Sequence, residues 1–287
     1  MRPSFAPPAT RFLASSPEGL QRATAALFGA PLDLTESFRS GTRGGPAAVR
    51  VLSEVLETYS PVLDRDLGTD ARVVDLGNVV LDSCPMEEAL ERIASAMAYA
   101  AATARLGVML GGEHTGSLGG FRGIRRVYPR AQLLHVDAHL DIRPEYEGQP
   151  TTHATWLHRL GDDFGFEVIH QVGVRSGDQH EWQLARQRTS FIGTELALPG
   201  EVRARLAEQP LYVSIDIDVL DPAQAPGTGC PEPGGYSFRE LAAFLYGLGG
   251  LPVVGLDVME VSPDTDPAGI TAAAAAKLVR EAVLLFS

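Results

Sequence analysis

The chain has 287 residues, of which 45% are hydrophobic and 21% charged, a balance typical of a globular enzyme with a sizeable core. Its 24 basic and 36 acidic residues give a net charge of −12, which argues against a nucleic-acid surface and mildly favours a cationic ligand. The two cysteines, Cys84 and Cys230, form no CxxC unit, which excludes a disulfide framework or a zinc ribbon.

The N-terminal segment is interrupted by prolines and lacks the apolar stretch of a signal peptide. We expect residues 1–28 to form an arm with a short helix, within a single domain that spans residues 1–287. The longest uncharged apolar run, residues 241–256, contains four glycines and one proline. It predicts a helix end followed by a buried strand rather than a membrane span. We therefore expect a cytoplasmic protein without a membrane partner.

After residue 30, short apolar runs alternate with helical patterns. Strands are predicted over residues 71–80, 106–110, 132–137, 167–174, 211–216 and 253–258. Helices are predicted over residues 46–57 and 86–106, after the capping box Ser237–Glu240, and from residue 271 onward. This alternation predicts an α/β fold with three αβα layers and a mainly parallel central sheet. In such folds the ligand site lies beyond the carboxyl ends of the strands.

Ionisable side chains occur where three of these predicted strands end. The candidates are His114, Asp137, His139, Asp141, Asp216 and Asp218. Within residues 135–141 and again at 216–218 these side chains fall at every second position, so an extended chain directs them to one side. Such groups are costly at a buried strand end unless they are paired or bind a cation.

Four carboxylates and two imidazoles exceed what one divalent ion needs, whereas two ions could share them. Ligation by oxygen and imidazole without cysteine suits Mn²⁺ better than structural zinc. The alternative is that these residues are solvated loop entries, which are common for single Asp-x-Asp or Asp-x-His pairs. Three such groups at three separate strand ends favour a site with two Mn²⁺ per chain.

At these residues the sequence resembles the ureohydrolase family of arginases and agmatinases, and agmatinases most closely. The matching blocks are GGEH at 111–114, DAHLD at 137–141, SIDIDVLDP at 214–222, APGTG at 225–229, DVMEVSP at 257–263 and FRSGTRGGP at 38–46. The resemblance covers the chain from about residue 29 onward. It implies an arginase-like fold and a binuclear manganese hydrolase that cleaves a guanidino compound to urea and an amine.

The resemblance also implies roles for single residues. One ion would be held by His114, Asp137, Asp141 and Asp216, and the other by Asp137, His139, Asp216 and Asp218. Asp137 and Asp216 would then bridge the two ions.

Three residues would act on the substrate. Asp141 would pass a proton to the leaving amine, Glu260 would hold the guanidinium group through paired hydrogen bonds, and His153 would shuttle a proton. His153 could instead be a surface histidine, because its neighbours depart from the family's His-Gly-Thr pattern.

Other nearby residues are predicted to support the site or to pack. Glu113 stands where the family usually has aspartate, and we expect it outside the ligand set. His135 is predicted to be a supporting or core histidine, and Trp156 a packing residue.

The metal motifs leave the preferred substrate open. Agmatine, cleaved to putrescine and urea, is favoured because Glu145 or Glu147 could receive its distal ammonium group. A guanidinium at Arg143 could bind the carboxylate of 4-guanidinobutyrate or 3-guanidinopropionate, although a solvated loop position is preferred for it. Arginase activity is the third alternative.

Two other classes of protein remain as alternatives. Lysine-deacylating enzymes of this general fold need only a single-metal Asp/His/Asp set, so His114, Asp141 and Asp218 argue against them. A non-catalytic metal-binding homologue would be expected to lack a ligand or Glu260. The resemblance further implies a homo-oligomer, a trimer or a hexamer.

Overall fold

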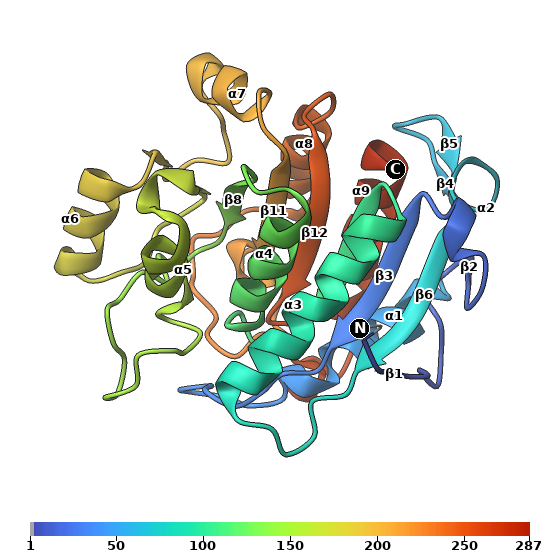
Figure 1. Cartoon of the computed structure of the whole chain (residues 1–287), viewed down its shortest axis with the longest axis horizontal. Coiled ribbons are helices and arrows are strands. Elements are labelled where there is room, and N and C mark those ends of the chain that lie inside the picture. The colour runs from blue at the N-terminus through green and yellow to red at the C-terminus, as the bar shows by residue number, and fades with distance from the viewer. Residues whose placement is uncertain (1–2) are drawn as a thin grey trace.

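The computed structural model describes residues 3–287, and a ten-stranded sheet forms its centre (Figure 1). The sheet order is β1 (Phe5–Ala6), β6 (Val73–Val79), β3 (Ala25–Ala30), β7 (Leu106–Gly111), β12 (Val253–Met259), β11 (Leu211–Asp216), β8 (Gln132–Val136), β9 (Ile169–Val172) and β10 (Phe191–Ile192), while β2 (Ser15–Ser16) also pairs with β6. Every pairing is parallel except that of β1 with β6. The predicted α/β fold with a mainly parallel sheet is confirmed.

Helices cover both faces of this sheet (Figure 1). One face carries α3 (Met86–Thr103), α4 (Gly116–Val127), α5 (Trp156–Phe164) and α6 (Gln179–Arg188). The other carries α1 (Gly45–Ser53), α2 (Leu67–Asp70), α7 (Gly200–Leu206), α8 (Phe238–Gly247) and α9 (Ile270–Phe286). Short elements complete the described chain, namely the hairpin β4 (Tyr59–Ser60) and β5 (Arg65–Asp66) and the 3-10 turns η1 (Leu20–Arg22), η2 (Thr42–Gly44), η3 (Phe166–Val168), η4 (Ile217–Val219) and η5 (Pro263–Thr265).

Strand β3 shows how the sheet separates two hydrophobic cores. All six of its residues are buried, and successive side chains alternate between the two faces. Leu27 packs into the core under α1 and α9, whereas Phe28 packs into the core under α3 and α4. A strand covered on both sides must be apolar throughout, which explains the unbroken apolar runs.

The structure differs from the expectation that residues 1–28 form an arm outside the sheet. Residues 25–28 of the segment assigned to the arm belong to β3, and Phe5–Ala6 and Ser15–Ser16 pair with β6. Phe12 is buried as well. The AALFGA sequence of β3 is rich in alanine and glycine, which have weak strand preferences, so its pattern gave no signal. Residues 1 and 2 of the expected arm lie outside the described residues.

Several predicted helix boundaries are confirmed, and others move. Ser237 and Glu240 form the predicted capping box of α8, with Glu240 N donating to Ser237 Oγ at 3.2 Å and Ser237 N donating to Glu240 Oε2 at 2.8 Å. The first predicted helix ends earlier, at Ser53 rather than near residue 57. No helix among residues 3–287 combines the length and apolar character that crossing a membrane requires.

A candidate metal centre at the carboxyl edge of the sheet

Four adjacent strands place the predicted ligands at one edge of the sheet. Strands β7, β12, β11 and β8 are neighbours and run parallel, so their carboxyl ends meet. His114 follows β7, Glu260 follows β12, Asp216 ends β11, and Asp137 follows β8. A cavity of about 430 Å³ opens at this edge. The structure therefore puts the candidates where the fold class predicts a ligand site.

The first group of ligand atoms surrounds the His114 imidazole. Its Nδ1 atom lies 3.0 Å from Asp137 Oδ2, 3.0 Å from Asp216 Oδ2 and 3.4 Å from Asp141 Oδ2. His114 Nδ1 and Asp137 Oδ2 are completely buried, and neither has a hydrogen bond of good geometry within the described chain. Buried donors and acceptors are seldom left this way unless another partner binds them.

The second group shares Asp137 with the first. His139 Nδ1 lies 2.9 Å from Asp218 Oδ2 and 3.7 Å from Asp137 Oδ1. One potential ligand atom from each of Asp137, His139 and Asp218 lies within 4.8 Å of the other two, and the same holds for His114, His135, Asp137 and Asp141. Two overlapping donor sets of oxygen and imidazole around one shared carboxylate fit a pair of divalent cations.

The pKa shifts of these groups show that their negative charges repel one another and that a cation would stabilise them. Burial, with the charges of Asp218 and Asp137, raises the pKa of Asp216 well above its ordinary value. Burial alone would lower the pKa of His114, but its short contacts with the carboxylates of Asp137, Asp141 and Asp216 raise it well above its usual range. Among the protein groups alone, protonated imidazoles offset the carboxylates. A metal would replace those protons, since ligating histidines must be neutral.

A buried network behind β11 fixes the orientation of His114. His114 Nε2 lies 2.9 Å from Ser214 Oγ, and Ser214 donates to Asp257 Oδ1 at 2.7 Å. Ser117 and Tyr212 donate to the other oxygen of Asp257, at 2.7 and 2.5 Å. Burial raises the pKa of Asp257, and three hydroxyl donors offset that effect. These partners hold the imidazole so that Nδ1 faces the carboxylates.

His135 lies where the sequence predicted, beside the ligands rather than facing the cavity. Its Nε2 atom is 2.8 Å from Asp137 Oδ2, and Gln171 Nε2 is 3.2 Å from its Nδ1. Gln171 thus holds the imidazole beside Asp137, while the contact between His135 Nε2 and Asp137 Oδ2 lacks good hydrogen-bond geometry.

Trp156 contributes more than packing. Its Nε1 donates to Asp141 Oδ2 at 2.9 Å, and its ring lies 4.8 Å from that of His114. Asp141 has a φ of 50°, a left-handed conformation that is unusual for a residue other than glycine. The packing role expected for Trp156 therefore has to be extended, because this indole fixes a carboxylate of the cavity wall.

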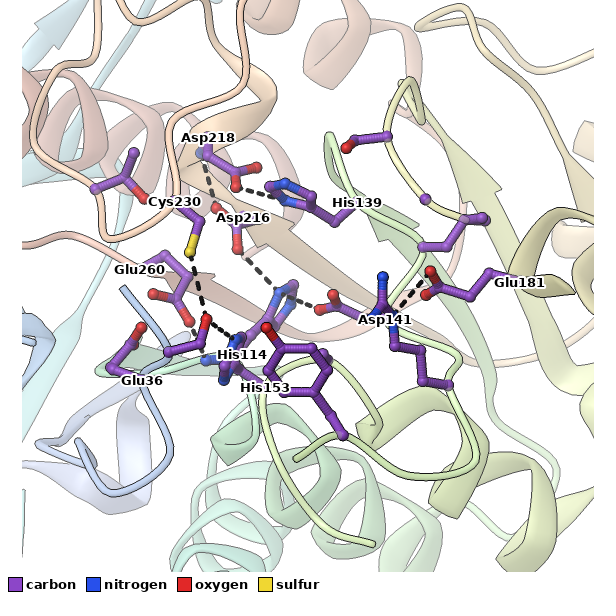
Figure 2. Close-up of a pocket in the computed structure, with 18 of the residues that line it drawn as sticks. Glu36, His114, His139, Asp141, His153, Glu181, Asp216, Asp218, Cys230 and Glu260 are labelled. Atoms are coloured by element: carbon purple, nitrogen blue, oxygen red, sulfur yellow. Dashed lines mark hydrogen bonds and ion pairs between the residues drawn. The ribbon is translucent and has the colours of Figure 1, made fainter. Parts of the chain in front are cut away.

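Glu260, at the end of β12, also has a positive φ and a carboxylate fixed by a hydrogen bond. It has a φ of 66°, and its Oε1 accepts a hydrogen bond of 2.6 Å from the backbone N of His114. Burial, followed by the negative charges of Glu36 and Asp216, raises its pKa well above the ordinary value. Figure 2 shows Glu260 and Glu36 on the same side of the cavity.

The loop that contains Thr35 joins Glu113 to His153. Glu113 accepts hydrogen bonds of 2.7 Å from both Thr35 N and Thr35 Oγ1, and one from Leu34 N. Thr35 Oγ1 is in turn 3.4 Å from His153 Nδ1 and accepts from His153 N at 3.1 Å. His153 lines the cavity, with Nε2 3.2 Å from Ser37 Oγ. The structure thus places His153 at the site and Glu113 behind it.

Arg143 lies in the far wall of the cavity and is paired there. Its Nε donates to Glu181 Oε2 at 3.0 Å, its NH2 is 3.7 Å from Asp178 Oδ2, and its guanidinium stacks over Tyr146. Arg143 lies in a loop with its side chain 33% exposed, but it is paired with acidic residues and lines the cavity rather than being fully solvated. Asp178 and Glu181 also form the capping box of α6.

The structure brings together every predicted site residue but not every predicted substrate contact. His114, His139, Asp141, Arg143, His153, Asp216, Asp218 and Glu260 line the cavity, and Asp137 lies directly beneath it. Glu145 and Glu147 are exposed and do not line it, because the loop turns them outward. Sequence reasoning missed Glu36, Cys230, Asp178 and Glu181, of which only the last two had a signal, the Asp-x-x-Glu spacing of a capping box.

The whole length of this architecture matches one known family. The profile of the Arginase family matches residues 23–285. The chain is 39% identical over 268 residues to an agmatinase of Halalkalibacterium halodurans, a match that covers 92% of each chain.

Two further proteins are similar over most of their length. A guanidinobutyrase of Pseudomonas aeruginosa is 32% identical over 279 residues, covering 93% of this chain and 87% of that protein. The crystal structure of an agmatine ureohydrolase of Thermoplasma volcanium superposes with a TM-score of 0.84 at 29% identity, covering 96% of this chain and 93% of the other.

Proposed function

The chain belongs to the Arginase family, and on that premise we propose that it is a binuclear manganese hydrolase that cleaves agmatine to putrescine and urea. The observation that carries the proposal is the pair of overlapping donor sets around Asp137, at the carboxyl ends of four adjacent strands. The agmatinase-type relatives support a guanidino substrate.

We assign the metal ligands as the sequence predicted. His114, Asp137, Asp141 and Asp216 would hold one cation, and Asp137, His139, Asp216 and Asp218 the other. When bound, two divalent cations supply a nucleophile at neutral pH by lowering the pKa of water. The buried oxygen and imidazole donors, with no thiolate among the two donor sets, favour Mn²⁺ over zinc.

The remaining chemistry belongs to the protein's own carboxylates and His153. Glu260, fixed by the backbone N of His114, would accept paired hydrogen bonds from the substrate guanidinium. Asp141, whose Oδ2 is held by Trp156, would carry a proton to the leaving nitrogen at its other oxygen, Oδ1. His153, bonded to Thr35 and Ser37 at the cavity wall, would exchange that proton with solvent.

The far wall of the cavity favours an ammonium group over a carboxylate. It carries the carboxylates of Asp178 and Glu181 and the single cation Arg143, so its balance is negative. Arg143 already donates to Glu181, whose side chain is only 4% exposed. A substrate carboxylate would have to displace this partner, whereas the ammonium of agmatine would add a favourable charge. These two acidic residues replace Glu145 and Glu147 as the predicted receptors.

The test is urea release by the Mn²⁺-loaded protein from agmatine, arginine, 4-guanidinobutyrate and 3-guanidinopropionate in parallel. We expect a kcat/KM for agmatine at least about 100-fold above the others, because an unpaired ion in a closed pocket costs several kcal/mol. Absence of urea from all four compounds, with two metals bound, would contradict the proposal.

A guanidino-acid hydrolase is the second candidate, because Arg143 does line the cavity. The variant R143Q separates the two. An agmatinase should keep its KM for agmatine within about threefold, since Arg143 makes no contact with the substrate. A guanidino-acid hydrolase should lose about 100-fold in kcat/KM for its acid, the cost of an unpaired substrate carboxylate.

Three broader expectations remain predictions. These are the single-domain organisation of residues 1–287, the cytoplasmic location and the assembly into trimers or hexamers.

A further inference from the structure

A second carboxylate lies beside Glu260 in the cavity. Glu36 lines the cavity together with Glu260, close enough for its charge to raise the pKa of Glu260. Figure 2 shows the two carboxyl groups together, on the opposite side of the cavity from Glu181. Residues 33–41 form a loop after β3, whose carboxyl end lies beside that of β7 at the metal edge, and this loop brings Glu36 to the cavity.

No protein cation neutralises this pair. Among the described residues, neither Glu36 nor Glu260 forms a salt bridge, and Asp33 and Glu113 add further negative charge within 4.8 Å of Glu36. The basic side chain whose charge acts on Glu36 is that of His153. Glu260 is buried and Glu36 is half-buried, and carboxylates in such positions are normally paired with a cation, so the arrangement indicates that a positively charged ligand completes it.

The loop holds Glu36 in this position from two sides. Thr42 Oγ1 donates to Glu36 Oε1 at 3.3 Å. On the other side Gly229 packs so closely that a Cβ atom there would lie 3.0 Å from Glu36 Oε2. Because these contacts already restrict the Glu36 side chain, binding of a ligand costs little further conformational entropy.

We propose that Glu36 is a second substrate-binding residue, which binds the guanidinium group of the substrate together with Glu260. This inference rests on the proposed function, because it requires a guanidino substrate. A planar guanidinium offers N–H donors along more than one edge, and each carboxylate can accept from a different edge. The substrate then supplies the cation that the two carboxylates lack.

The test compares E36Q with D33N in the metal-loaded protein. E36Q removes the charge but keeps an acceptor for Thr42. D33N removes an equal charge from the same loop. Asp33 does not line the cavity, and its carboxylate accepts a hydrogen bond from Gly41 N. Gly41 can still donate to the amide oxygen, so the loop should keep its shape. D33N therefore controls for the general loss of negative potential.

We expect E36Q to raise the KM for the preferred guanidino substrate about tenfold while kcat changes less than threefold. A loss of binding shared by ground and transition states has this effect. D33N should change KM less than twofold. A KM for E36Q within twofold of the D33N value would overturn the proposal, and so would a fall in kcat with KM unchanged.

A binding measurement keeps this test independent of turnover. Guanidinium chloride is titrated into the metal-loaded protein and followed by calorimetry. An affinity for guanidinium about tenfold lower in E36Q than in D33N would support the role of Glu36. This holds even if no compound releases urea, because the absence of urea counts against the proposed function alone. Equal affinities, or no binding of guanidinium to the wild-type protein, would refute it.

Discussion

At the scale of single residues, the site depends on side chains that hold the ligands as much as on the ligands. His114 is oriented by Ser214, and Asp141 by Trp156. Asp141 and Glu260 both have positive φ, a conformation that costs about 1–3 kcal/mol for such residues. Packing elsewhere must offset that cost at these two residues, both of which are assigned to substrate chemistry.

Replacing Trp156 by phenylalanine tests this support. W156F keeps a ring against His114 but removes the Nε1 donor to Asp141. We expect kcat to fall about 10- to 100-fold, the usual effect of losing a partner behind a ligand. The measurement is steady-state urea release together with metal content. Activity within twofold of wild type would contradict a positioning role for the indole.

At the scale of elements, the turns after the strands decide where the ligands lie. Gly112 joins β7 to His114, and its carbonyl accepts from Glu260 N at 2.9 Å. A Cβ atom at Gly112 would lie 2.0 Å from the carbonyl oxygen of Leu32, so no side chain fits. These close backbone contacts hold the ends of β7, β12 and β3 together.

We therefore expect G112A to destabilise the protein by at least about 3 kcal/mol, the upper range for overpacking at a rigid backbone. Denaturant unfolding measures this change. G247A is the matched control, because a Cβ atom there meets nothing within 4 Å. In helix α8 that substitution should be neutral or stabilise by up to about 1 kcal/mol. Equal stability of the two variants would be inconsistent with this packing.

His170 on β9 gives the sheet a pH-dependent stability. It is buried, and burial lowers its pKa to about 4 from 6.5, although the Leu133 and Val168 backbones oppose the shift. Between these two values the unfolded chain binds a proton that the folded chain does not. Stability therefore rises with pH across this window, by up to about 3 kcal/mol.

The variant H170Q removes this titration. From denaturant unfolding at pH 4 to 7, the stability of wild type relative to H170Q should increase with pH and level off above about pH 6.5. Protonation of the metal ligands affects both proteins and cancels in the difference. A difference that is flat with pH would exclude a depressed pKa at His170.

The sequence was most informative where a buried strand ends in polar residues. Asp137, His139 and Asp141 were predictable because alternate positions of one short segment carry them. Glu36 and Trp156 were not, because a loop after β3 and the helix α5 bring them to the cavity from distant parts of the chain. Arg143 was identified as a cavity candidate, but its pairing with Glu181 depends on how α6 packs, and no local pattern encodes that.

At the scale of the whole molecule, the fold concentrates negative charge where it can bind cations. The net charge of −12 is spread over the chain, but the carboxylates at the carboxyl edge of the sheet are buried and repel one another. The parallel sheet between two apolar cores supplies the rigid support that such a cluster needs. Two metals and a cationic substrate would relieve this repulsion, so binding and stability are coupled.

The most direct test of this account is to remove the metals with a chelator and return Mn²⁺ in steps. We predict that Tm and urea release from agmatine both fall on removal, with Tm lower by several degrees, and that activity returns in full only at two ions per chain. D137N should bind neither ion tightly, because Asp137 belongs to both donor sets. Full activity without metal, or saturation at one ion per chain, would contradict the binuclear centre.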